Sequence, residues 1–211
     1  SEEAGFDGVE LHGAHGYILA LFLSSEINKR DDQYGQSLSN RSRILFEIID
    51  GIRRDCNPNF IVGVRLSPER FGLKLGEIIT LAEQLMTSSK IDFLDMSLWD
   101  VFKEPEEEAF QGKKLISYFT ELDRGHTKLG VAGSIRTPGD AEKTMAEGVD
   151  WVMLGRAAIL HHNFPQMYEA NHNFLPIEIP VSEQYLSDEG VSEKFIEYLR
   201  KWKFVSEPNQ T

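Results

Sequence analysis

The chain carries five short, almost continuously apolar runs. Longer segments separate them, in which apolar residues are spaced among polar ones. The runs cover residues 6–11, 60–66, 91–98, 128–132 and 151–154. Unbroken hydrophobicity over such a short length is typical of a strand that is covered on both faces in a parallel sheet. The pattern therefore predicts a buried parallel sheet.

The segments between these runs predict helices. In residues 40–54, apolar residues recur three and four positions apart and form one stripe, at Ile44, Leu45, Ile48, Ile49 and Ile52. Similar spacing or a helix-start signal marks the other candidates, which are residues 76–86, 113–122, 138–146, 157–170 and 192–203. Strands that alternate with helices, without hairpin signals between them, indicate an α/β protein.

The composition excludes several classes of protein. The chain has 34 acidic and 22 basic residues and a net charge of −12, which argues against a nucleic-acid partner and against an anionic membrane surface. Its single cysteine, Cys56, excludes an internal disulfide framework and a cysteine-ligated iron–sulfur cluster. No apolar run approaches the length of a membrane span, and no signal peptide is recognisable. We expect a soluble, cytoplasmic protein.

Two histidines and a tyrosine directly follow the first apolar run. His12, His15 and Tyr17 stand in a turn that also contains Gly13 and Gly16. Glycine relieves the steric limits on the backbone, so three polar side chains can crowd one point at a strand end, where α/β enzymes keep their chemistry. The alternatives are a pair of hydrogen-bonded histidines without chemistry, or a metal site, for which the sequence offers no third ligand.

Glycines also follow the last two apolar runs. Gly133 and Ser134 end the first of these runs, and Gly155 and Arg156 end the second. In eight-stranded α/β barrels, the loops after strands seven and eight bind phosphate together with a helix N-terminus. The backbone N–H groups of the first three residues are therefore candidates to cradle a phosphate, and Arg156 is a candidate to clamp it.

If these runs are strands seven and eight, residues 6–11 form strand four. The expected fold is then a TIM (β/α)8-type barrel that is incomplete, with strands four to eight present and strands one to three missing, since a full barrel needs about 250 residues. Residues 1–170 would form this partial barrel, and residues 171–211 a tail with one helix that packs on it. The unpaired strand edges and open interior predict a homo-oligomer, or association through the exposed edges.

Two stretches of the sequence carry a more specific resemblance. One is Glu10-Leu11-His12-Gly13-Ala14-His15-Gly16-Tyr17, followed by Phe22-Leu23-Ser24, Asn28, Arg30, Asp32, Tyr34-Gly35, Ser37 and Asn40-Arg41. The other is the closing pair Gly133-Ser134-Ile135 and Leu154-Gly155-Arg156. From residue 4 to about residue 168, the sequence resembles the old yellow enzyme family of flavin-dependent ene-reductases.

The resemblance implies a role for each residue at the first site. His12 and His15 are similar to the pair that hydrogen-bonds the substrate carbonyl oxygen, and Tyr17 is similar to the proton donor to the α-carbon. Arg65 is similar to the arginine beside the N1/O2 edge of the flavin. Members of the family accept hydride from NADH or NADPH and pass it from flavin N5 to the β-carbon of an enone or enal.

The resemblance also implies FMN as the cofactor, because Gly133, Ser134, Gly155 and Arg156 match the residues that hold its phosphate. Two other hypotheses stay open at this point. One is a phosphate-binding barrel lyase or isomerase without flavin, although the lysines that an aldolase would need at a strand end, Lys74 and Lys103, fall in loops. The other is a truncated fragment without activity.

Overall fold

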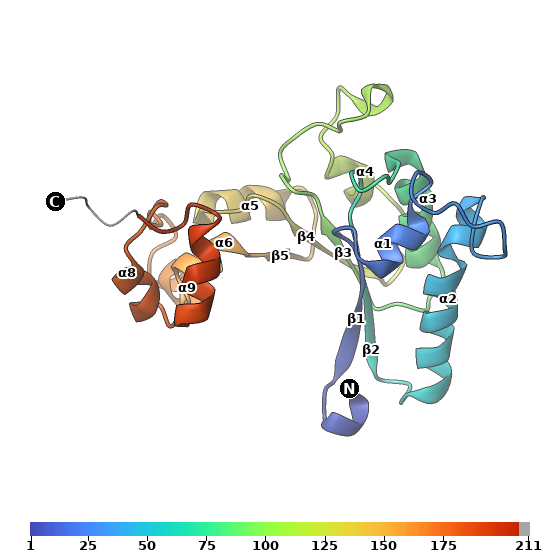
Figure 1. The fold of residues 1–211 in the computed structure, drawn as a ribbon, viewed down its shortest axis with the longest axis horizontal. Coiled ribbons are helices and arrows are strands. Elements are labelled where there is room, and N and C mark those ends of the chain that lie inside the picture. The colour runs from blue at the N-terminus through green and yellow to red at the C-terminus, as the bar shows by residue number, and fades with distance from the viewer. Residues whose placement is uncertain (207–211) are drawn as a thin grey trace. The chain divides into compact units, whose positions relative to one another are not determined.

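The computed structural model describes residues 1–206 of the chain, which divide into two compact units (Figure 1). The first unit contains residues 1–134 and 144–153, and the second contains residues 135–143 and the chain from residue 154 onward. The boundary expected near residue 170 lies inside the second unit, and as a domain boundary it stays a prediction.

The first unit is built on a sheet of five parallel strands in chain order, and all five predicted strands are confirmed. The strands are β1 (Gly8–Gly13), β2 (Ile61–Leu66), β3 (Phe93–Ser97), β4 (Lys128–Ala132) and β5 (Trp151–Met153). The register aligns one residue of each strand in a single row, formed by His12, Arg65, Asp95, Gly130 and Trp151. This row sets three side chains with ionisable groups next to one another.

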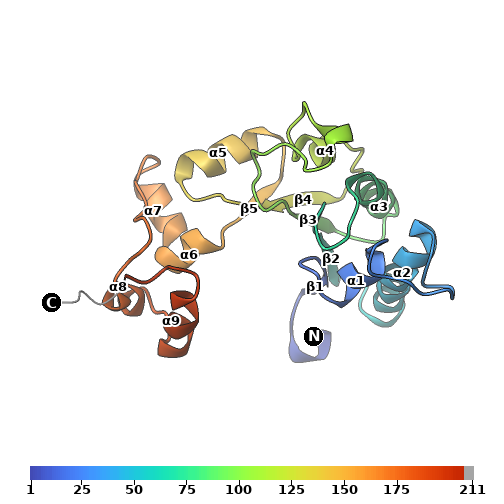
Figure 2. The same ribbon diagram turned by 45° about the horizontal axis from the view of Figure 1, so that its top comes forward.

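Helices cover the outer side of this sheet (Figure 2). The first unit contains α1 (Ile18–Leu23), α2 (Leu38–Asp55), α3 (Leu75–Thr87) and α4 (Ser117–Thr120). The helices expected over residues 40–54 and 76–86 are confirmed as α2 and α3. The helix expected over residues 113–122 shrinks to the four residues of α4, because the backbone N–H of Leu115 donates to Lys103 O at 2.9 Å instead of entering a helix.

The second unit is helical. The helix α5 (Pro138–Ala146) begins in it and continues into the first unit, and it is followed by α6 (Arg156–Leu160), α7 (Phe164–Ala170), α8 (Glu183–Asp188) and α9 (Glu193–Arg200). Two clusters of buried apolar side chains hold these helices together: Leu160, Val181, Leu186, Ile196, Leu199 and Phe204, and Ala157, Phe164 and Phe174. The described part of the tail, residues 171–206, thus contains the two helices α8 and α9 where the sequence predicted one.

The single helix expected over residues 157–170 is wrong, because the chain breaks between α6 and α7. Pro165 lacks the backbone N–H that a continuous helix would use, and its ring is tolerated only in a first helical turn. His161 lies at the break, and its Nε2 accepts a hydrogen bond from Ile177 N at 2.9 Å. Among residues 1–206, no helix is long and apolar enough to cross a membrane.

Candidate active site

The turn after β1 brings His12, His15 and Tyr17 together, as the sequence predicts. His15 and Gly16 both adopt left-handed backbone conformations, with φ of 59° and 73°. This reversal places His15 Nδ1 3.2 Å from His12 Nε2, and the ring of Tyr17 lies 5.3 Å from that of His12. The backbone N–H of His15 donates to Ser67 Oγ at 3.0 Å, which ties the turn to the end of β2. Tyr17 precedes α1 and is 64% exposed, so its hydroxyl is accessible to a ligand.

The electrostatic environment of His15 favours its neutral form. Partial burial lowers the pKa of His15, and the positive charges of His12 and Arg65 lower it further, against the opposing effect of Glu10. The hydrogen bond between the rings uses one ring nitrogen of each histidine, Nδ1 of His15 and Nε2 of His12. The other nitrogen of each ring remains to interact with a bound ligand. Within the described residues, no group of three or more His, Cys, Asp or Glu side chains could hold a metal ion.

Arg65 lies next to His12 in the register of the sheet, and its guanidinium is held by acidic side chains on both sides. Its Nε is 2.7 Å from Glu10 Oε1, and its Nη2 is 3.6 Å from Asp95 Oδ2. Nη2 also lies 3.0 Å from the sulfur of Met153. Sequence reasoning assigned no role to either carboxylate, although each is a charged residue inside a run that is mostly apolar.

The residues predicted to bind phosphate belong to different units of the chain. Gly133 and Ser134 end β4 in the first unit, in a tight turn with φ of 154° and 52°. A Cβ on Gly133 would lie only 3.0 Å from Asp100 N, so this backbone approach requires glycine. The hydroxyl of Ser134 donates to Trp99 O at 3.1 Å. Gly155 and Arg156 belong to the second unit, and a Cβ on Gly155 would meet open space.

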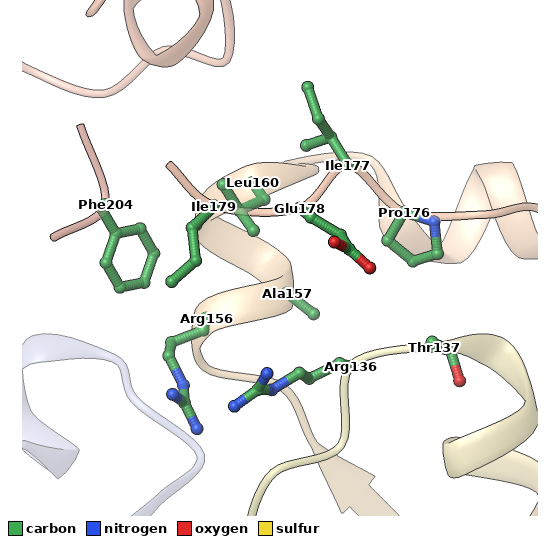
Figure 3. A pocket seen from close by; sticks show the side chains of 10 residues that line it. All are labelled: Arg136, Thr137, Arg156, Ala157, Leu160, Pro176, Ile177, Glu178, Ile179 and Phe204. Atoms are coloured by element: carbon green, nitrogen blue, oxygen red, sulfur yellow. The ribbon is translucent and has the colours of Figure 1, made fainter. Parts of the chain in front are cut away.

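In the second unit, Arg156 lines a pocket of about 270 Å³ together with a second arginine (Figure 3). The guanidinium groups of Arg136 and Arg156 point toward one another at one end of this pocket. The pKa of Arg156 is lowered by burial first and then by the positive charge of Arg136. Two neighbouring cations favour an anion between them, so these side chains fit a phosphate group.

The pocket also changes two details of the sequence interpretation. Arg136 was not among the predicted residues, although it follows the Gly133-Ser134 turn by only two positions. The helix that starts at Arg156 has five residues, which is too short to supply the helix N-terminus that the phosphate argument invoked. The rest of the pocket lining is mostly apolar and comes from Ala157, Leu160, Pro176, Ile177, Ile179 and Phe204, but it also includes Thr137 and the carboxylate of Glu178 (Figure 3).

Much of the long motif after Tyr17 builds a loop. The side-chain amide of Asn28 donates to the carbonyl oxygens of Phe22 and Tyr34, each at 2.7 Å. Asp32 accepts from Arg30 Nε and from Tyr34 N, each at 3.0 Å. These hydrogen bonds hold the loop between α1 and α2 in one conformation. This part of the motif therefore has a structural role beside the histidine turn.

Comparison with known proteins decides the family. The model of the NADH:flavin oxidoreductase / NADH oxidase family matches residues 1–173. The chain belongs to this family. A probable NADH-dependent flavin oxidoreductase of Bacillus subtilis is 33% identical over 169 residues, which are 77% of this chain and 45% of that protein. The 12-oxophytodienoate reductase 2 of Arabidopsis thaliana is 50% identical over 66 residues, which are 31% of this chain and 17% of that protein.

A solved structure of morphinone reductase in complex with tetrahydroNAD matches the fold with a TM-score of 0.67 and 25% identity. The match covers 92% of this chain and 53% of that one. The resemblance to the old yellow enzyme family is thereby confirmed, and the α/β sheet fits an incomplete (β/α)8 barrel of this family. The chain spans about half the length of the curated relatives it matches.

The family assignment also bears on the cofactors and on the type of reaction. The family and its Bacillus subtilis member are named for a flavin and for NADH, which confirms the flavin cofactor, the nicotinamide donor and the oxidoreductase class at the level of the family. The family assignment therefore favours a flavin-dependent oxidoreductase over a lyase or isomerase without flavin.

Proposed function

We propose that this chain carries the proton-donating and carbonyl-binding half of an FMN-dependent reductase, which reduces the C=C bond of an α,β-unsaturated carbonyl compound. The observation that carries the proposal is the cluster of His12, His15 and Tyr17 at the carboxyl end of β1, one register position from Arg65. Two relatives, 12-oxophytodienoate reductase and morphinone reductase, bear names of reductases of oxygenated substrates, which supports this substrate class.

Different residues would act on the two parts of the substrate, its carbonyl oxygen and its C=C bond. FMN, when bound and reduced by NADH or NADPH, supplies the hydride for the β-carbon of the substrate. Negative charge then develops on the carbonyl oxygen, and the imidazole N–H groups of His12 and His15 stabilise it. The phenol of Tyr17 donates its proton to the α-carbon, which completes the addition of two hydrogens.

Separate residues would hold the two ends of FMN. Arg65, fixed by Glu10, places a positive charge for the N1/O2 edge of the ring. Gly133, Ser134, Gly155 and Arg156 would hold the phosphate, and Arg136 adds a second cation at the Arg156 end. The enone or enal substrate, the absence of nucleic-acid and membrane partners, the cytoplasmic location and the association through strand edges stay predictions.

The Tyr17→Phe variant tests the proposed proton donor. We expect it to slow enone reduction by about 10²–10⁴-fold, the usual contribution of a positioned general acid. It should leave flavin reduction by NADPH within about threefold, because that step takes no proton from Tyr17. Stopped-flow measurement of the two half-reactions gives both rates.

A second tyrosine variant provides the control. Tyr198 lies in α9 and is 48% exposed, so Tyr198→Phe removes a phenol of similar accessibility outside the cluster. Both half-reactions should keep their wild-type rates in this variant. Equal slowing of both half-reactions by Tyr17→Phe would contradict its role as the proton donor.

A further inference from the structure

The guanidinium of Arg65 lies between two carboxyl groups on one face of the sheet. Glu10 of β1 and Asp95 of β3 flank Arg65 of β2, with Arg65 at 2.7 Å from Glu10 and at 3.6 Å from Asp95. Glu10 and Arg65 are partly exposed, whereas Asp95 is only 3% exposed. The most buried carboxyl group of the cluster is therefore the one farther from the positive charge.

The charges of this cluster do not balance if both carboxyl groups are ionised. Two carboxylates and one guanidinium leave a net charge of −1, and Asp95 would carry the poorly compensated part of it. Within the described residues, Asp95 Oδ1 is buried and lacks a well-aligned hydrogen-bond partner, so the indole of Trp151 stabilises its charge only weakly. An ionised, buried oxygen that is so poorly compensated is costly, whereas a protonated one becomes a donor.

We propose that Asp95 is a positioning residue that holds a proton well above the pH at which an ordinary carboxyl group loses it, and that in this form it donates a hydrogen bond to the Glu10 carboxylate. Glu10, oriented in this way, forms a neutral ion pair with Arg65 and fixes the guanidinium in the row beside His12. The proton between the two carboxyl groups thus sets the position of the Arg65 guanidinium. It also makes the net charge of the three side chains zero.

The surroundings of Asp95 support this protonation state. Burial is the largest effect, and with the hydrogen bond and negative charge of Glu10 it raises the pKa of Asp95 to about 7, against the opposing effects of Arg65 and Trp151. The neighbouring strand β4 presents Gly130, where a Cβ would lie 2.0 Å from Asp95 Oδ1. The carboxyl group is therefore packed directly over backbone, and the groups with charge that face it are Glu10 and Arg65.

The inference deepens the proposed function, because it rests on that function for the role of Arg65 toward the flavin ring. Loss of the proton from Asp95 would add a negative charge beside Arg65 and weaken the local preference for an electron-rich ring edge. The protonation itself is a property of this chain without cofactor, so it can be tested independently of flavin binding.

Infrared or ¹³C-NMR titration of the side-chain carboxyl groups tests the proposal on the purified chain. In the wild type, one carboxyl group should titrate at about pH 7. This signal should disappear in Asp95→Asn and move to lower pH in Glu10→Gln, which removes the acceptor charge. It should persist in the control Asp55→Asn, because Asp55 forms an exposed pair with Arg54 at 2.7 Å.

The pH dependence of unfolding provides a second readout. Because the folded state holds the proton of Asp95 more tightly than the unfolded state does, stability should fall as pH rises from the ordinary value of 3.8 to about 7. The slope over this range should be smaller in Asp95→Asn than in Asp55→Asn. Equal slopes, together with the absence of a carboxyl group titrating near pH 7 in the wild type, would overturn the proposal whether or not the chain binds flavin.

Discussion

Replacing His12 with alanine is expected to lower kcat/KM for enone reduction by about 10²–10³-fold, the usual effect of removing one preorganised donor to a developing oxyanion. His12 lies at the carboxyl end of β1, close to both other members of the cluster. Its Nε2 is 3.2 Å from His15 Nδ1, and its ring centroid is 5.3 Å from that of Tyr17. Its loss removes a donor and leaves His15 without the partner that orients its ring. Steady-state assays with a cyclic enone and NADPH measure the effect.

Two further variants separate donor loss from general damage. His15→Asn replaces one imidazole by an amide that still carries N–H donors, so we expect a smaller loss than in His15→Ala. His126→Ala removes an exposed histidine outside the cluster and should leave kcat/KM unchanged. Full activity in both His12→Ala and His15→Ala would contradict the role given to the pair.

Replacing Arg41 with alanine is expected to cost about 3–5 kcal/mol of unfolding free energy, the usual penalty for breaking a buried ion pair. Arg41 is 2% exposed and forms a bidentate pair with Glu77 of α3, at 2.6 and 3.1 Å. Its guanidinium also donates to Leu23 O, at the end of α1, and to Gln36 O at 3.1 Å. One side chain thus joins α1, α2, α3 and the loop after Tyr17.

Urea unfolding followed by circular dichroism measures this loss. Arg54→Ala is the matched control, because Arg54 is on the same helix and pairs with Asp55 while 72% exposed, so its replacement should leave the unfolding free energy close to that of the wild type. If Arg41→Ala does not fold, Arg41→Lys keeps the charge without the bidentate geometry and should show a partial loss. A loss below about 1 kcal/mol in Arg41→Ala would contradict the anchoring role.

The sheet and its active end could be predicted because they depend on strong local patterns. Residues 128–132 form β4 as predicted, since a continuous apolar run suits a strand covered on both faces. The positions of His12, His15 and Tyr17 followed from the spacing of two glycines in the turn. The prediction of one helix over residues 157–170 failed because it followed the apolar spacing without weighing Pro165, which is tolerated only in a first helical turn and so separates α6 from α7.

The residues that sequence reasoning missed act through contacts between distant segments. Asp95 gains its meaning from the register that aligns it with Arg65, and a sequence does not display register. Arg136 matters because its guanidinium faces that of Arg156, twenty positions along the chain. Arg41 belongs to the motif that carried the resemblance, but only the structure gives its partners.

We propose that the chain recognises FMN through its phosphate. Titration of the purified chain with FMN and with riboflavin, followed by flavin fluorescence, tests this most directly. The account predicts saturable binding that is about tenfold or more tighter for FMN, since the phosphate adds charge-assisted hydrogen bonds. The preference should shrink in Arg156→Gln and persist in the exposed control Arg54→Gln. Equal affinity for FMN and riboflavin, or no binding of either by a folded chain, would contradict the account.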